Sequence, residues 1–230
     1  MSCAPHVTPV LIRAGGAALE GDLVTAAGGV GTIVLAHGSH GRRASGRDRH
    51  VAHVLRSARL ATLLVDLLTA EEAGEDAPAR GARVDVALLT DRLTGVVEWA
   101  RLRSPHPRPV GILGASVGAA AALAVAALRP DLVGVVVSRG GRPDPAAGLL
   151  GDVRAPTLLI VGGADAPAIR LNQEARALAA DRPRGDAPVR GARRPRHRGR
   201  PGQRLVHAPS RHPGDASRGA MTWTSPPRST

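Results

Sequence analysis

The stretch Pro109-Val-Gly-Ile-Leu-Gly-Ala-Ser-Val-Gly118 decides the fold of this 230-residue chain. An apolar run ends at Gly114, a G-x-S-x-G motif surrounds Ser116, and an Ala-rich segment follows over residues 119–128. This order predicts a strand, a tight turn and a helix, with Ser116 held in a strained backbone conformation between glycines that leave room for it. The hydroxyl would stand at a helix N-terminus, where the helix dipole favours negative charge. The alternative is a Gly/Ala-rich strand–helix joint with an incidental serine.

The chain on both sides of this motif alternates between predicted strands and helices. Two short strands, 7–14 and 17–26, form an antiparallel start, and an acidic loop covers 71–82. The further strands are predicted at 31–36, 61–68, 110–113, 131–137 and 156–161, and the helices near 51–58, 89–100, 119–128 and 168–178. Such alternation predicts an α/β fold with a mostly parallel sheet and helices on both faces.

Polar side chains follow the carboxyl ends of these strands, where functional groups gather in parallel sheets. The residues concerned are His37, Ser39, Ser116, Arg139, Asp144 and Asp165. Their convergence at one edge favours an active site over an incidental joint.

The net charge of +12 is concentrated in the last 49 residues. Residues 182–230 hold 12 Arg against two Asp, together with eight Pro and six Gly, whereas residues 1–181 are nearly neutral. We therefore expect one domain over 1–181 and a disordered tail over 182–230, because the tail has too few large apolar residues to offset the entropy of ordering. The abrupt change near Asp181 also suggests the hypothesis of a frameshift in a GC-rich gene.

Several classes of protein are disfavoured by composition. Cys3 is the only cysteine, so we expect no disulfide framework and no zinc cluster. The N-terminus lacks the pattern of a signal peptide, and the long apolar run 111–128 contains the Gly-Ser-Gly turn. We expect a cytoplasmic protein without a membrane span; the oligomeric state stays open.

Taken in order, five segments resemble the α/β-hydrolase superfamily, and more closely its dienelactone-hydrolase-like serine esterase branch. They are a strand followed by His-Gly-Ser at 37–39, LLVDLLT at 63–69, GASVG at 114–118, VVSRGGRPD at 136–144 and PTLLIVGGAD at 156–165. Dienelactone hydrolase itself uses a cysteine nucleophile where this chain has Ser116, so its substrate is not implied.

The resemblance implies a role for each matching residue. Ser116 would be the nucleophile, and the N–H groups of Ser39 and Val117 would form the oxyanion hole. Asp165 would be the triad acid that orients a histidine, with Asp144 in reserve one strand earlier. The alternative for Asp165 is a helix-capping residue, for which aspartate is well suited.

The triad histidine is not recognisable, because residues 182–230 lack the expected strand, Gly-x-x-His turn and final helix. His197 lies 32 residues after Asp165, the separation a triad would need, although neighbouring arginines disfavour the imidazolium that a base must become. His207 and His212 are the alternatives. No cofactor and no metal are implied.

Two functional hypotheses follow from these residues. The first is a serine hydrolase that cleaves small esters or lactones through an acyl-enzyme on Ser116. The second is an inactive hydrolase-like scaffold whose basic tail binds nucleic acid or another polyanion through phosphates.

Overall fold

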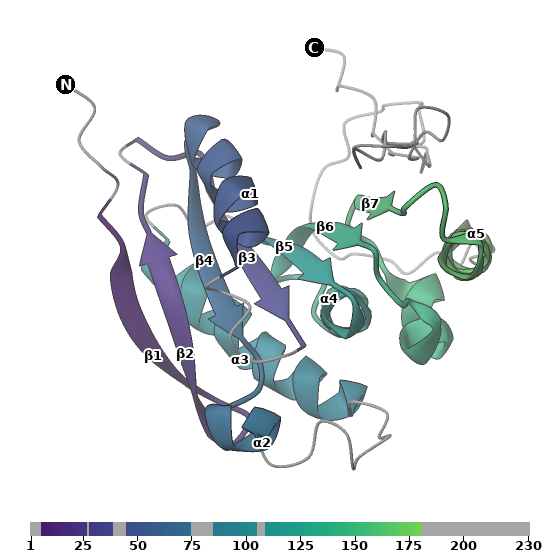
Figure 1. Ribbon diagram of the computed structural model, residues 1–230, viewed down its shortest axis with the longest axis horizontal. Coiled ribbons are helices and arrows are strands. Elements are labelled where there is room, and N and C mark those ends of the chain that lie inside the picture. The colour runs from purple at the N-terminus through teal and green to yellow at the C-terminus, as the bar shows by residue number, and fades with distance from the viewer. Residues whose placement is uncertain (1–5, 27, 39–44, 75–84, 105–108, 181–230) are drawn as a thin grey trace, which may run out of the picture.

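The computed structural model describes residues 6–26, 28–38, 45–74, 85–104 and 109–180, which form one seven-stranded sheet with helices on both faces (Figure 1). The strands are β1 (Thr8–Ala14), β2 (Ala17–Val24), β3 (Gly31–His37), β4 (Leu60–Asp66), β5 (Val110–Ala115), β6 (Val133–Arg139) and β7 (Thr157–Ile160), in the order β1-β2-β4-β3-β5-β6-β7. The helices are α1 (Gly46–Ser57), α2 (Ala70–Gly74), α3 (Val86–Arg103), α4 (Val117–Leu128), the 3₁₀ segment η2 (Asp144–Asp152) and α5 (Ala166–Ala180).

The pairing pattern confirms the predicted mostly parallel sheet. The first two pairings, β1 with β2 and β2 with β4, are antiparallel, and every other pairing is parallel. The motif strand β5 lies inside the sheet, between β3 and β6. Polar groups at the carboxyl ends of β3, β5, β6 and β7 therefore share one edge of the sheet.

The two faces of the sheet are covered unequally. On one face α3 and α4 enclose the main apolar core, which includes Val34 and Ile112. On the other face α1 packs over a smaller cluster of Leu35, Leu64 and Leu113. Since side chains alternate along a strand, odd-numbered residues of β3, β5 and β6 face α1. Because of this alternation, the side chains of His37 and Arg139 lie on the face that α1 covers.

The short helix α2 overlaps the start of the segment predicted as a loop over 71–82, so that prediction was wrong for its first residues. The Thr69 hydroxyl accepts from the Glu72 N–H, and the Glu72 carboxylate accepts from the Thr69 N–H at 2.9 Å, which is a capping box. Arg92 of α3 then donates two hydrogen bonds to Glu72, at 2.6 and 2.7 Å, and one to the Leu67 carbonyl. This tertiary ion pair supports a helix of only five residues, Ala-Glu-Glu-Ala-Gly. The 3₁₀ segment η2 was likewise not predicted.

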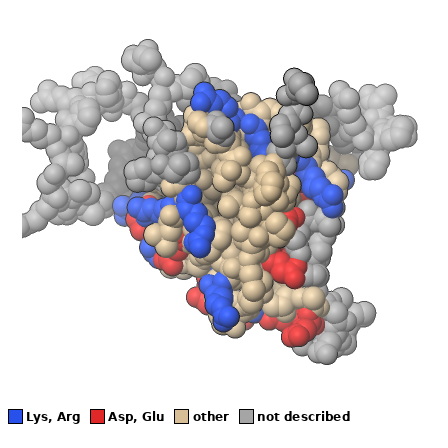
Figure 2. Space-filling model, turned by 90° about the vertical axis from the view of Figure 1, so that its left-hand side faces the viewer, with Lys and Arg blue, Asp and Glu red and all other residues tan. Residues whose placement is uncertain are grey.

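Figure 2 views the molecule from its β1 flank, where acidic and basic side chains are scattered over a largely uncharged surface. The outer positions of β1 and β2 carry both signs, with Arg13 and Glu20 exposed. This face agrees with a nearly neutral body. Within the described residues no helix is long and apolar enough to cross a membrane. The predicted boundary at 181 and 182 falls where the description ends, so the tail remains a prediction.

We predict that the Glu72→Gln variant loses about 2 kcal/mol of unfolding free energy at pH 7, because it leaves the Arg92 guanidinium buried without its anion. The hydrogen bonds from Arg92 lower the pKa of Glu72 to about 2, from an ordinary value of 4.5. A depressed carboxyl pKa stabilises the fold above the unfolded value, and this contribution fades as the pH falls from about 4.5 towards 2.

Urea unfolding at pH 7 and pH 3 measures both effects. The difference between wild type and Glu72→Gln should shrink at the lower pH. Glu98→Gln, which removes the partner of the half-exposed Arg129, is the matched control and should change stability little at either pH. An equal effect of both variants would contradict the prediction.

Candidate active site

Ser116 occupies a strained turn between β5 and α4. Its φ of 52° and ψ of −124° lie in a region that residues with a Cβ rarely adopt, and among the described non-glycine residues it shares a positive φ only with Arg59. The residue is exposed, and its hydroxyl makes no capping hydrogen bond to α4. The predicted strand, strained turn and helix are confirmed, and together they form a sharp elbow with Ser116 at its apex.

Two glycines make the turn sterically allowed. A Cβ on Gly114 would lie 2.5 Å from the Gly118 carbonyl oxygen and 2.6 Å from the Ala119 Cα. A Cβ on Gly118 would lie 2.7 Å from the Ala36 carbonyl oxygen. The absence of a side chain at Gly114 lets the chain reverse after β5. The absence of one at Gly118 lets α4 start directly against the end of β3.

Of the two residues predicted to form the oxyanion hole, Val117 is described by the structure and Ser39 is not. Val117 is the first residue of α4, where amide groups lack partners inside the helix. Gly38 lies against the same turn, since a Cβ there would be 3.3 Å from both the Gly118 nitrogen and the Val117 Cβ. Ser39 lies outside the described residues, so its role remains a prediction. What the structure shows is that the chain leading to Ser39 touches the first turn of α4.

Asp165 lies after β7 and caps α5. Its Oδ1 accepts a hydrogen bond from the Ala168 N–H at 3.0 Å, and the side chain is exposed. The capping alternative is therefore observed, but it occupies only one carboxylate oxygen. β7 lies two strands from β5, which at the usual strand spacing places the two carboxyl ends about 10 Å apart.

The reserve acid Asp144 is differently placed. It is the first residue of η2, and both of its carboxylate oxygens accept from Arg142, at 2.9 and 3.3 Å. Asp165 has the freer carboxylate of the two.

The proposed bases His197, His207 and His212 lie outside the described residues. The described histidines are His6, His37, His50 and His53. Only His37 ends a parallel strand, and it makes no hydrogen bond to Ser116. The triad is therefore not assembled within the described part of the chain.

A buried charged cluster beneath the turn was not predicted as a unit. His37 Nε2 lies 3.2 Å from Asp48 Oδ2, and Arg139 donates to Asp48 Oδ1 at 2.6 Å. Burial lowers the pKa of His37, and the neighbouring Asp48 carboxylate opposes this shift without reversing it. Burial works against ionisation of Asp48, but the neighbouring His37 and Arg139 hold its pKa below the usual range.

Sequence reasoning placed His37 and Arg139 at strand ends but missed Asp48 and Asn172. Asn172 is fully buried in α5 and donates to the Gly141 carbonyl at 3.1 Å. A polar residue on the inward side of an amphipathic helix was the available signal for both. Their partners, 91 and 31 residues away, could not be found from spacing.

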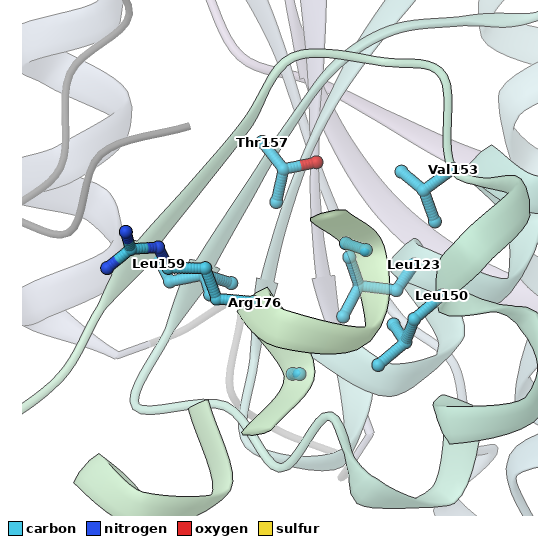
Figure 3. A pocket seen from close by; sticks show the side chains of 8 residues that line it. Leu123, Leu150, Val153, Thr157, Leu159 and Arg176 are labelled. Atoms are coloured by element: carbon cyan, nitrogen blue, oxygen red, sulfur yellow. The ribbon is translucent and has the colours of Figure 1, made fainter. Parts of the chain in front are cut away.

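Figure 3 shows a small pocket among the packed elements at the β7 side of the sheet. It has a volume of about 20 Å³, room for roughly one water molecule, and lies between α4, η2, β7 and α5. Its lining is mostly apolar and excludes Ser116: Leu123, Leu150, Val153, Thr157, Leu159, Ala175, Arg176 and Ala179. Among the described residues, no group of three or more His, Cys, Asp or Glu side chains is placed to hold a metal ion.

The sheet order and the strained serine define an α/β hydrolase fold, and comparisons with known proteins narrow this class. A crystal structure of a dienelactone hydrolase from Anabaena variabilis is 48% identical, with a TM-score of 0.70 over 76% of this chain and 81% of that one. A crystal structure from Klebsiella pneumoniae that carries the provisional name dienelactone hydrolase, at 17% identity and a TM-score of 0.61, shares the fold. The chain belongs to the dienelactone hydrolase-like family of α/β hydrolases.

The chain spans well under half of the length of the curated relatives that it matches. Two Mycobacterium tuberculosis proteins, which carry the provisional name phosphoribosyl transferase, are 48% identical over 170 residues. These residues are 74% of this chain, which spans only 38% of the length of either relative. No family model matches the chain.

We predict that Gly118→Ala destabilises the protein by about 1–3 kcal/mol, because the new methyl group must displace the backbone of β3 at Ala36. Gly46→Ala is the matched control, since nothing lies within 4 Å of its added Cβ and alanine favours the start of α1. Thermal unfolding of both variants tests this prediction. Equal melting temperatures for the two variants would show that α4 does not rest on β3 as described.

Proposed function

We propose that this chain is a serine hydrolase that cleaves small ester or lactone substrates. The observation that supports this most is the backbone of Ser116, which holds an exposed hydroxyl at the N-terminus of α4 at the cost of an unfavourable φ. Membership of the dienelactone hydrolase-like family supports hydrolytic chemistry in general. The phosphoribosyl transferase name is not carried over, because the matching segment is well under half of those relatives and also matches a dienelactone hydrolase.

In the proposed reaction the Ser116 Oγ attacks the carbonyl carbon while a histidine removes its proton. The Val117 and Ser39 amides stabilise the oxyanion, the alcohol leaves with the proton, and water then hydrolyses the acyl-enzyme. Asp165 would orient the histidine through the oxygen that α5 leaves free. His197 is the proposed base, with His207 and His212 as the alternatives.

We predict that a fluorophosphonate probe labels the wild-type chain and that Ser116→Ala abolishes labelling and lowers p-nitrophenyl acetate turnover by about 10³-fold or more. Ser57→Ala, at an exposed serine near the end of α1, is the matched control and should retain both signals.

The same assay separates the hydrolase from the alternative scaffold. Absence of labelling in the wild type, with salt-sensitive DNA binding that disappears when the chain is ended at Asp181, would support a polyanion-binding scaffold and overturn the hydrolase.

The Asp165→Asn variant separates the triad role from the capping role. Asparagine caps helices about as well as aspartate, so the melting temperature should stay at the wild-type value. A triad acid, by contrast, cannot be replaced by its amide, and kcat should fall roughly 10³- to 10⁴-fold. Asp144→Asn, in the same assay, should leave kcat nearly unchanged. If the two variants exchange these outcomes, the acid is Asp144.

A further inference from the structure

The buried cluster of His37, Asp48 and Arg139 ties together three separate elements at the edge that carries Ser116. His37 ends β3, Asp48 lies in the first turn of α1, and Arg139 ends β6. Asp48 is fully buried and His37 is 2% exposed. One oxygen of the Asp48 carboxylate accepts a hydrogen bond from the Arg139 guanidinium, and the other lies 3.2 Å from His37 Nε2 without hydrogen-bond geometry.

The cluster straddles the strand that delivers the serine. Ala115, the residue before Ser116, is in register with His37 on one side and with Arg139 on the other. All three positions face α1 by strand alternation. The contacts that Asp48 makes from α1 therefore join the two strands that flank the end of β5.

Both strands held in this way also touch the elbow directly. On the β3 side, Gly38 packs against Val117 and Gly118. On the β6 side, the Arg142 N–H donates to the Ser116 carbonyl at 3.2 Å. Asn172 fixes the same β6 loop from α5 through the Gly141 carbonyl. A displacement of either strand end would thus move the serine or the amides around it.

A buried carboxylate is not the most stable way to join three elements. Burying charge is costly, and replacing a buried ion pair by apolar side chains is often neutral or stabilising. What a charged pair offers over an apolar contact is a defined geometry. The location of this pair beside Ser116, with the main apolar core on the opposite face, points to a positional role.

We propose that Asp48 is a positioning residue for the serine chemistry, which holds β3 through His37 and the β6 loop through Arg139. This inference rests on the proposed hydrolase function for its catalytic consequence. The mechanical part, that Asp48 orders the chain on both sides of the elbow, stands without it.

The test is Asp48→Asn, which keeps the shape of the side chain and removes its charge. Asp131→Asn is the matched control, because it removes an aspartate that also pairs with arginine but is exposed and lies before β6, at the opposite end of that strand. The measurements are kcat and KM with p-nitrophenyl acetate, the rate of fluorophosphonate labelling, the melting temperature, and hydrogen exchange of the backbone amides.

For Asp48→Asn we expect kcat and the labelling rate to fall by about 10²-fold, with KM within about twofold of wild type. Hydrogen exchange should accelerate at 36–38, 116–119 and 139–142, and stay unchanged in β1 and β2. The control should match wild type in every measurement. A role only in global stability would instead lower the melting temperature and leave the kcat of the folded enzyme unchanged.

Two results would overturn the proposal, and both differ from a failure of the hydrolase function. If wild type is labelled and Asp48→Asn is labelled at the same rate, Asp48 does not position the serine. If wild type is not labelled at all, the hydrolase function fails, and unchanged exchange at 36–38 and 116–119 in Asp48→Asn would then overturn the mechanical part as well. A second variant, Asp48→Leu combined with Arg139→Leu, replaces the whole ion pair by apolar side chains, which often preserves stability, and should show the same local acceleration.

Discussion

The left-handed backbone of Ser116 is the constraint on which the rest of the site depends. A φ of 52° at a residue with a Cβ is unfavourable by itself, so the surrounding structure must hold it in place. The backbone of α4 passes so close to β5 and β3 that only glycine fits at 114 and 118. This backbone conformation exposes Ser116 at the carboxyl end of β5.

The segments around Ser116 are held both by close backbone packing and by polar contacts. Backbone packing of Gly38 on Gly118 fixes the distance between β3 and α4, but apolar contacts allow sliding. Hydrogen bonds define directions as well as distances. Here they run from the Arg142 backbone N–H to the Ser116 carbonyl, from the Asn172 side chain to the Gly141 carbonyl, and from Arg139 to Asp48. The elbow is thus surrounded by directional contacts on the β6 side and by close backbone packing on the β3 side.

Much of this arrangement could be predicted, because it rests on local patterns. The alternation of apolar strands and helices predicted the mostly parallel sheet, and the G-x-S-x-G between a strand and an Ala-rich helix predicted the strained serine. For Asp165 the sequence predicted either a triad acid or a helix cap. The structure shows the cap, which uses Oδ1 and leaves Oδ2 unused by α5. The α2 helix was missed because its stability comes from Arg92, 20 residues further along the chain. Asp48 and Asn172 were missed because nothing within a few residues of either identifies a partner.

By itself, the sequence determined the strands and helices, the strained serine and the edge at which polar groups collect, because these depend on short-range periodicity and on the steric freedom of glycine. Only the tertiary structure decided which buried charges meet. Asp48 is 91 residues from Arg139, and strand order and register, not spacing along the chain, bring the two together. Pairing of buried polar groups is a property of the packed sheet, because a carboxylate remains charged in the interior only where a cation from another element reaches it.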